Sequence, residues 1–273
     1  MDQSIKSNRD SLHGISKTVS QVIIMELKKV DINYFKRGAF ENPKFWSNFG
    51  GKPSLIGTNV LDLGCGHGSL CIDIALSGAS KVVGIDTNSM LINFAQENLK
   101  QNYPHLKKRI EFLDINLRDY QKGKFDYIIS KDAFEHILDL KMIIKEMNKL
   151  LKLKGRIYSG FGPLYQTPYG DHGRTKALVP YGHLLIPEHV IINRVNRRRE
   201  NKITSIQELG LNKMSLSDYH KLFSLSGLDI IYFEANQGSH IILRLSSLIR
   251  KIHTLYQFFA FNLYCILEKV GVN

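Results

Sequence analysis

Three glycines and two acidic residues, at fixed spacing, form the part of the chain that is best suited to bind a ligand. Residues 60–68 read Val-Leu-Asp-Leu-Gly-Cys-Gly-His-Gly, and residues 82–86 read Val-Val-Gly-Ile-Asp. The apolar residues predict two buried strands, the first of which enters a glycine turn and then a helix. Because glycine has no Cβ, the backbone amides of such a turn can approach a ligand closely. The pattern therefore predicts a site that holds a nucleoside.

The acidic residues indicate which kind of nucleoside this is. A dinucleotide fingerprint places its third glycine three residues after the second, but Ser69 stands there and Gly68 comes one residue early. Asp62 lies two residues before Gly64, where it would repel a pyrophosphate and attract an ammonium group. Asp86, about 20 residues further along, is placed to accept hydrogen bonds from a ribose diol. We therefore expect a cofactor with a positive group.

The motif DLGCGHG resembles the first motif of the class I S-adenosylmethionine-dependent methyltransferases. The resemblance implies S-adenosylmethionine as cofactor, with Asp62 near its methionine part and Asp86 on its ribose. It also implies that an acid at the end of the third strand approaches the adenine amino group, with the next residue beside the ring. The cofactor-binding residues expected on this basis are Asp62, Gly64, Cys65, Gly66, Gly68, Asp86, Thr87, Asp114, Ile115 and Ser130.

Strand and helix patterns alternate along most of the chain. Further strands are predicted at 109–113, 125–130, 156–161 and 228–234, and helices at 88–100, 140–151 and 215–227, with Gly155 as a helix stop. Such alternation specifies an α/β doubly wound sheet that binds ligands at the carboxyl ends of its strands. The resemblance adds a last strand at 261–268, antiparallel beside the fifth. We expect a Rossmann-like seven-stranded sheet, parallel with one antiparallel strand, with helices on both faces.

The domain organisation follows from this arrangement. One methyltransferase domain over 1–273 accounts for nearly all of the chain, with a helical cap at 1–58 and a substrate-binding insertion at 161–214. An amphipathic run at 245–260 packs on the sheet or on a partner, or else lies at a membrane surface. No run of 18 apolar residues and no signal-peptide pattern is found, and three cysteines form no framework of pairs, so we expect a cytoplasmic protein.

The insertion is a long loop rich in Gly and Pro that nevertheless carries many tyrosines and histidines. Long ordered loops in compact domains are usually functional, so we expect this one to form the acceptor pocket and its lid. Methyl transfer to a hydroxyl needs a base, and imidazole titrates near neutrality. The expected catalytic residues are His172, His183 and Tyr169, and the expected substrate-binding residues are Tyr165, Asp171 and Tyr181.

A second constellation follows the fourth strand. Residues 132–136 have the pattern D-x-x-E-H, close to the E-x-x-E-H metal site of some ubiquinone-pathway and small-RNA methyltransferases. Asp132, Glu135 and His136, joined by a distant histidine such as His183, would suit Mg²⁺ or Zn²⁺. Many metal-independent relatives also carry the E-H pair, where it lines the pocket. We expect no metal and keep these three residues as the alternative.

The acceptor is less defined than the cofactor. The insertion resembles that of bacterial methyltransferases that modify small molecules or saccharides, which implies a hydroxyl of a small molecule or sugar as acceptor. Carbon or nitrogen methylation is the alternative, and the net charge of +12 keeps RNA as a runner-up, although no aromatic residues are interleaved with the basic clusters. A non-catalytic binding module and a homodimer contact through the insertion also remain open.

Overall fold

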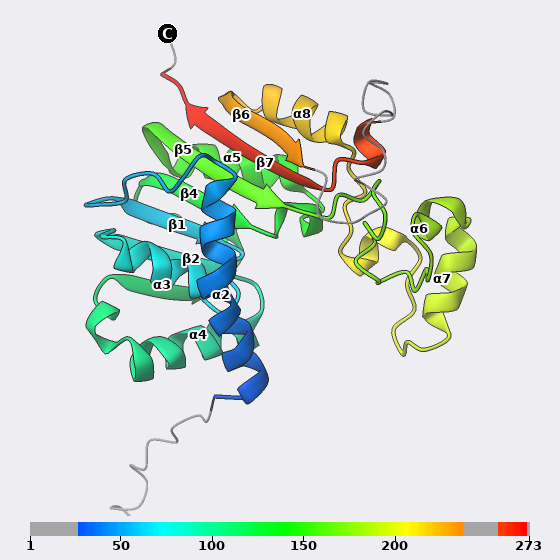
Figure 1. Ribbon diagram of the computed structural model, residues 1–273, viewed down its shortest axis with the longest axis horizontal. Helices are drawn as coiled ribbons and strands as arrows, with labels where there is room; N and C mark the ends of the chain where they lie inside the picture. Colours follow the sequence, from blue (N-terminus) through cyan, green and yellow to red (C-terminus); the bar gives the residue numbers. More distant parts are fainter. Residues whose placement is uncertain (1–26, 237–255, 272–273) are drawn as a thin grey trace, which may run out of the picture.

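The computed structural model describes residues 27–236 and 256–271, and these form one seven-stranded sheet (Figure 1). The strand order is β3-β2-β1-β4-β5-β7-β6. This order reverses at β1 and β4, which is where doubly wound sheets bind their ligands. The strands are β1 (Asn59–Leu63), β2 (Lys81–Asp86), β3 (Ile110–Asp114), β4 (Phe125–Lys131), β5 (Leu151–Phe161), β6 (Leu228–Asn236) and β7 (Asn262–Lys269).

The pairing confirms the predicted mixed sheet. Strands β3, β2, β1, β4 and β5 are parallel, and β7 runs antiparallel to both of its neighbours, β5 and β6. The register of β2 and β3 ends with Asp86 opposite Asp114. The carboxyl ends of β1, β2 and β4 consequently meet at one edge of the sheet.

Helices cover both faces of the sheet, as expected. On one face, α2, α3 and α4 bury residues such as Trp46, Leu70 and Phe94. On the other face, α5 and α8 pack Met147 and Phe223 into a separate core cluster. The helices are α2 (Lys29–Ser47), α3 (Ser69–Leu76), α4 (Ser89–Asn102), α5 (Leu140–Leu150), α6 (Gly182–Leu185), α7 (Glu188–Asn196) and α8 (Leu216–Ser224).

Side-chain caps explain where helices α4 and α8 begin. The side chain of Asn88 accepts a hydrogen bond from the backbone N–H of Met90 and so caps α4. Ser215 and Asp218 form a capping box at the start of α8. Both starts agree with the sequence patterns.

One predicted boundary is wrong. Helix α5 ends at Leu150, and β5 begins at the next residue, so Gly155 lies inside a strand and does not stop the helix. A Cβ on Gly155 would lie 2.8 Å from the carbonyl oxygen of Lys152. The glycine is therefore required by close backbone packing where the pairing of β4 and β5 is irregular.

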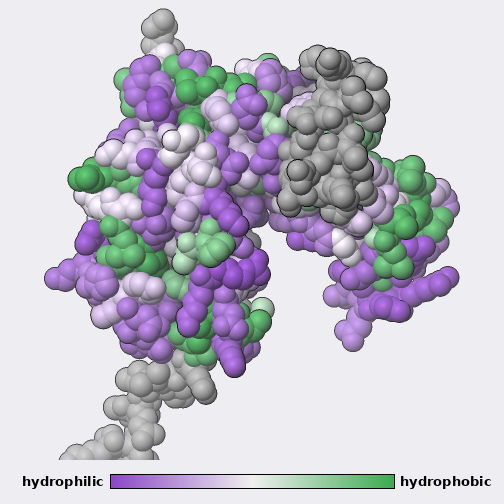
Figure 2. All heavy atoms as spheres, viewed as in Figure 1, coloured by the Kyte–Doolittle hydropathy of each residue, from purple (hydrophilic) through white to green (hydrophobic). Residues whose placement is uncertain are grey.

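The segment between β5 and α8 forms a lobe that stands out from the sheet (Figure 1). Residues such as Ile191, Val195 and Ile206 give this lobe a small core of its own. The lobe carries exposed apolar residues, among them Leu178 at 91% and Leu185 at 77% exposure. Figure 2 shows hydrophobic surface on this lobe. The lobe corresponds to the predicted insertion at 161–214.

The remaining predictions on organisation are tested only in part. Of the expected cap at 1–58, the structure describes residues 27–58, which contain the single helix α2. Most of the amphipathic run at 245–260 lies outside the described residues, and Tyr256–Phe258 form one turn of 3-10 helix. Within the described part of the chain, no helix combines the length and the apolar character needed to cross a membrane.

Candidate functional site

A cavity of about 720 Å³ opens at the edge of the sheet where β1, β2 and β4 end. Its walls come from the glycine turn, the ends of β2 and β3, the segment after β4, and the lobe. The residues that line it include Gly64, Asp86, Thr87, Asn88, Leu91, Ile115, Asn116, Arg118, Asp132, Ala133, His136, Ile137 and Arg174. Six of the thirteen were expected from the sequence: Gly64, Asp86, Thr87 and Ile115 as cofactor residues, and Asp132 and His136 only as alternative metal ligands.

Asp86 organises the entrance to this cavity. One carboxylate oxygen accepts a hydrogen bond from the backbone N–H of Gly66 at 2.9 Å, and the other accepts from the N–H of Asn88 at 2.9 Å. The carboxylate thus links the glycine turn to the start of α4. Each of its oxygens has further lone pairs, which a diol could use.

The glycines of the turn are required for two different reasons. Gly64 and Gly68 have φ values of 76° and 78°, which favour glycine. A Cβ on Gly64 would lie 2.9 Å from the Cβ of Ala133 on the cavity wall, whereas a Cβ on Gly68 would lie 2.6 Å from the ring of Phe112. Gly68 therefore serves the packing of the turn on the sheet, and Gly64 keeps the cavity wall open.

Asp62 is buried between the glycine turn and α3, at 1% exposure, and does not line the cavity. Burial raises the pKa of its carboxyl group to about 7, although the thiol of Cys71 donates a hydrogen bond to it at 3.2 Å. An ionised carboxylate at this position is costly unless a cation is near. Cys65 of the turn is also buried and lies outside the cavity wall.

Two further expected cofactor residues do not reach the cavity. Asp114 ends β3 with an exposed side chain, and its neighbour Ile115 lines the cavity in its place. Ser130 is fully buried and donates a hydrogen bond to the carbonyl oxygen of Leu63 at 3.0 Å. Ser130 thus ties β4 to β1.

His136 and Arg174 face the cavity from the segment after β4 and from the lobe. The Nδ1 of His136 donates to the carbonyl oxygen of Gly210 at 2.9 Å, which leaves Nε2 with the lone pair of a neutral ring. Arg174 donates to the carbonyl oxygens of Gly210 and Leu209 at 2.9 and 2.7 Å. Burial and the nearby guanidinium lower the pKa of His136, so the ring is neutral near pH 7.

His172 packs against His136 from the lobe. The centroids of the two rings are 4.7 Å apart, and ligand atoms of Glu135, His136 and His172 lie within 4.8 Å of one another. Burial lowers the pKa of His172 to about 4. The structure thus joins Glu135 and His136 with His172, whereas the sequence grouped them with Asp132 and His183.

The other residues expected in the acceptor pocket hold the lobe together. His183 is buried at 3% exposure and donates to the carbonyl oxygen of Tyr165 at 2.5 Å, beside a separate cavity of about 310 Å³. Asp171 accepts hydrogen bonds from the backbone and hydroxyl of Thr175, and Tyr181 donates to the carbonyl oxygen of Phe258. None of these residues, nor Tyr169, lines the cavity of about 720 Å³ at the edge of the sheet. A loop without regular backbone pairing needs such side-chain hydrogen bonds to stay ordered.

Arg174 and Asn116 are among the cavity residues that the sequence analysis did not name as functional candidates. Arg174 is one basic residue within an irregular loop, and no spacing rule places it next to His136, 38 residues earlier. Asn116 follows Ile115 at the end of β3 and could have been found from its position. Because the sequence analysis considered His136 only as a metal ligand, it did not predict that this side chain lines the cavity.

Glu135 supplies a prediction about stability. Its carboxyl group is buried at 4% exposure, one oxygen accepts from the N–H of Gly162, and the other has no partner among the described residues. Burial raises its pKa to about 8, so the folded chain holds this proton more tightly than the unfolded chain. The stabilisation is complete below about pH 4.5 and is lost as the pH rises towards 8.

We therefore expect Glu135→Gln to remove this pH dependence. Urea unfolding at pH 5 and at pH 8 should show the variant gaining roughly 2–3 kcal/mol relative to the wild type over that interval. Glu146→Gln, which replaces a half-buried carboxylate of α5 that pairs with Lys149, is the control and should leave the pH dependence unchanged. Equal pH dependence in the wild type and in Glu135→Gln would contradict the buried, protonated carboxyl group.

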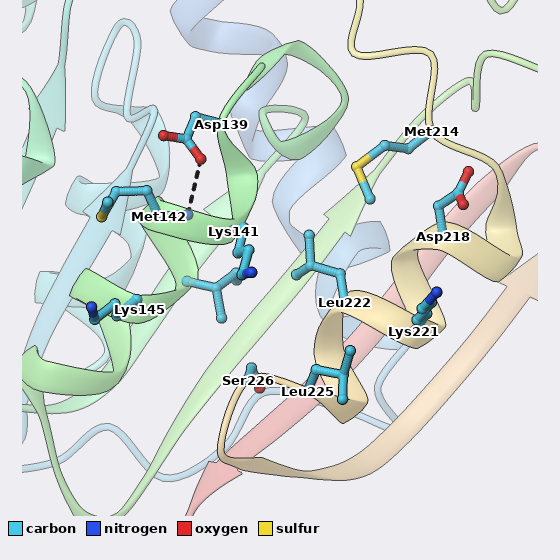
Figure 3. Close-up of a pocket in the computed structure, with 11 residues that line it drawn as sticks. Asp139, Lys141, Met142, Lys145, Met214, Asp218, Lys221, Leu222, Leu225 and Ser226 are labelled. Atoms are coloured by element: carbon cyan, nitrogen blue, oxygen red, sulfur yellow. Dashed lines mark hydrogen bonds between the residues drawn. The ribbon is translucent and has the colours of Figure 1, made fainter.

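A second cavity, of about 730 Å³, lies between α5 and α8 (Figure 3). Leu222 and Met214 point into the space between the two helices. Its two acids are engaged in helix caps, since Asp139 accepts from the N–H of Met142 and Asp218 from that of Ser215. The described residues that line it include no histidine, cysteine or tyrosine. Of these two cavities, the first is therefore the one that a histidine lines.

Comparisons with known proteins agree with this geometry. The family model for a methyltransferase domain matches residues 56–164, which run from just before β1 to just after β5. The ubiquinone biosynthesis O-methyltransferase of Pelagibacter ubique is 35% identical over 129 residues, which cover 47% of this chain and 51% of that protein. The chain thus spans about half the length, or less, of the curated relatives that it matches.

Solved structures extend the likeness over most of the chain. An S-adenosylmethionine-dependent methyltransferase from Mesorhizobium loti has a TM-score of 0.53 and 16% identity, covering 80% of this chain and 94% of that one. The magnesium protoporphyrin IX methyltransferase from Synechocystis, with bound S-adenosylhomocysteine, has a TM-score of 0.51 and 17% identity, covering 89% and 88%. At these identities the comparison establishes a shared fold.

Proposed function

We propose that this chain, whose residues 56–164 match the model of a methyltransferase domain and whose fold is shared with S-adenosylmethionine-dependent methyltransferases, methylates a hydroxyl group of a small molecule. The observation that carries the proposal is Asp86, held by two backbone amides at the entrance of the cavity beside Gly64. A carboxylate oriented in this way suits the two hydroxyls of a ribose. The name of the Pelagibacter ubique relative supports a hydroxyl acceptor.

The cavity fits the chemical parts of S-adenosylmethionine. Leu91 and Ile115 offer apolar walls for the adenine ring, Asp86 accepts from the ribose, and the glycine turn borders the methionine part. The buried carboxyl group of Asp62 would be stabilised as a carboxylate by the positive charges of that part. When bound, this cofactor supplies an electrophilic methyl group on a sulfonium.

His136 is the residue that we assign as the general base. Its Nε2 carries the lone pair, because Nδ1 donates to Gly210, and the side chain lines the cavity. Arg174 donates a long hydrogen bond of 3.4 Å to this lone pair, and the acceptor hydroxyl would replace that contact. The bound cofactor would supply its methyl group to the acceptor oxygen, and the Nε2 of His136 would take the hydroxyl proton. Proton removal of this kind contributes about 10²–10⁴-fold in rate. His172, packed on His136, keeps the ring in place.

The same geometry favours transfer without a metal ion. The guanidinium of Arg174 lies 3.4 Å from the Nε2 of His136, where its charge would repel a cation bound to Glu135, His136 and His172. The Nδ1 of His136 is also committed to a carbonyl oxygen. Asp132 lines the cavity but is absent from this cluster of ligand atoms.

We expect metal removal to leave methyl transfer unchanged. After dialysis against EDTA, the initial rate should stay within about twofold of the untreated rate, since a general base and not a Lewis acid activates the hydroxyl. Added Mg²⁺ and Zn²⁺ should not raise it. A loss of more than tenfold that Mg²⁺ or Zn²⁺ restores would instead support the metal site.

Isothermal titration with S-adenosylhomocysteine tests the proposed function. A folded sample should bind one equivalent with a dissociation constant in the micromolar range, which is about −8 kcal/mol. Circular dichroism on the same sample establishes that it is folded. A folded protein that shows no binding would contradict the enzyme and favour a binding module that keeps only the fold.

A further inference from the structure

Arg174 is a guanidinium on the wall of the cavity that has no acidic partner among the residues that the structure describes. Its hydrogen bonds in the described part of the chain go to the carbonyl oxygens of Leu209 and Gly210 and to the Nε2 of His136, and none goes to a carboxylate. Arg118, the other arginine on the wall, differs because it pairs with Asp139 at 2.6 Å. Arg174 therefore brings an uncompensated positive charge to the cavity.

The neighbours of Arg174 do not neutralise this charge. His136 and His172 are imidazoles whose pKa values are lowered by burial, so both rings are neutral near pH 7. The carboxyl group of Glu135 is buried with its pKa raised to about 8, so it is mainly protonated at that pH. An unpaired charge beside neutral groups is costly in the free protein and is relieved by an anionic ligand.

The guanidinium is also fixed in orientation. One terminal nitrogen is held by both carbonyl oxygens and the other lies 3.4 Å from the Nε2 of His136, which leaves Nε–H and the second N–H of that other nitrogen as donors. Gly210 permits this close approach, because at its φ of 73° an added Cβ would lie 2.8 Å from that nitrogen. A planar fork held in this way matches the two oxygens of a carboxylate or phosphate.

We propose that Arg174 binds an anionic group of the acceptor, which makes the substrate a hydroxylated carboxylic acid or phosphate ester. This inference rests on the proposed function, since it assigns the acceptor of the same site. The anion would also offset the second positive charge that forms when the hydroxyl proton reaches His136, 3.4 Å from the guanidinium. Arg174 thus determines acceptor specificity and takes no proton itself.

The test uses small anions in place of the unidentified acceptor. The full chain, saturated with S-adenosylhomocysteine, is titrated with benzoate, with its neutral analogue benzamide, and with inorganic phosphate. We expect at least one of the two anions to bind, and to bind at least tenfold more weakly to Arg174→Gln, as expected for loss of a charge-assisted pair. Benzoate and phosphate distinguish a carboxylate from a phosphate site. Benzamide should bind the wild type and the variant equally weakly.

Two control variants accompany the titration. Arg118→Gln should leave anion affinity within about threefold, because Asp139 already neutralises that arginine. Arg174→Lys keeps the charge, and it should retain more anion affinity than Arg174→Gln while losing the bidentate geometry. Circular dichroism and the affinity for S-adenosylhomocysteine establish that each variant is folded.

The possible outcomes separate the two proposals. Anion affinity that is unchanged in Arg174→Gln, or absent in the wild type, would overturn the acceptor assignment. So would a loss of S-adenosylhomocysteine affinity as large as the loss of anion affinity, since Arg174 would then hold the cofactor carboxylate. If the wild type fails to bind S-adenosylhomocysteine, the proposed function is contradicted, and the same anion titration of the ligand-free protein still measures Arg174.

Discussion

Replacing Asp86 by Ala should weaken the binding of S-adenosylhomocysteine by about two orders of magnitude or more. Two hydrogen bonds from the ribose to a carboxylate would be lost, each of which contributes about 1.5–3 kcal/mol. The substitution also removes the acceptor that holds the N–H groups of Gly66 and Asn88. Isothermal titration of wild type and variant at one pH measures the change.

Asp114→Ala is the matched control for this variant. Asp114 pairs with Asp86 in the register of neighbouring strands and also ends its strand, but only Asp86 lines the cavity. We expect Asp114→Ala to change the affinity by less than about threefold, since an exposed carboxylate contributes little. Equal losses in both variants would place the adenine on Asp114, and no loss in Asp86→Ala would show that the ribose lies elsewhere.

Replacing His136 by Asn should lower kcat by about 10²–10⁴-fold while S-adenosylhomocysteine still binds. The variant loses the base on the cavity wall, whereas Asp86 and the glycine turn are untouched. The measurement is the initial rate of product formation with a hydroxylated acid that the wild type methylates. Because burial lowers the pKa of His136, the wild-type rate should fall only as the pH drops through a value below 6.5.

His183→Asn is the comparison for this prediction. The sequence analysis named His183, and not His136, as a candidate base, but His183 is buried in the lobe and donates to the carbonyl oxygen of Tyr165. We expect this variant to lose stability, by about 1–3 kcal/mol for a buried hydrogen bond, and to keep most of its kcat. A large loss of kcat in His183→Asn with full activity in His136→Asn would reverse the assignment of the base.

Of the ten residues that the sequence assigned to the cofactor, four line the cavity: Gly64, Asp86, Thr87 and Ile115. Their common position could be predicted because they lie at the ends of neighbouring parallel strands, which the alternation of strand and helix brings together. The other six do not line the cavity, and two of these have structural roles. Gly68 is required because a Cβ at this position would clash with the ring of Phe112. The hydroxyl of Ser130 donates its hydrogen bond to the carbonyl oxygen of Leu63.

The acceptor side could not be predicted in the same way. Its contacts join residues far apart in sequence, such as His136 with Gly210 and Arg174, and these contacts depend on how an irregular loop folds back. The tyrosines and histidines of the loop were conspicuous, yet Tyr181 and His183 satisfy backbone carbonyl groups. The composition of this loop indicated a functional role, but only the fold shows which of its side chains face the cavity.

A crystal structure of the full chain with S-adenosylhomocysteine tests the central claim most directly. The account predicts that the ligand occupies the cavity at the ends of β1 and β2, with both ribose hydroxyls within about 3.2 Å of the Asp86 carboxylate and the sulfur on the side of His136 and Arg174. A ligand bound outside this cavity, or a ribose that makes no contact with Asp86, would contradict it.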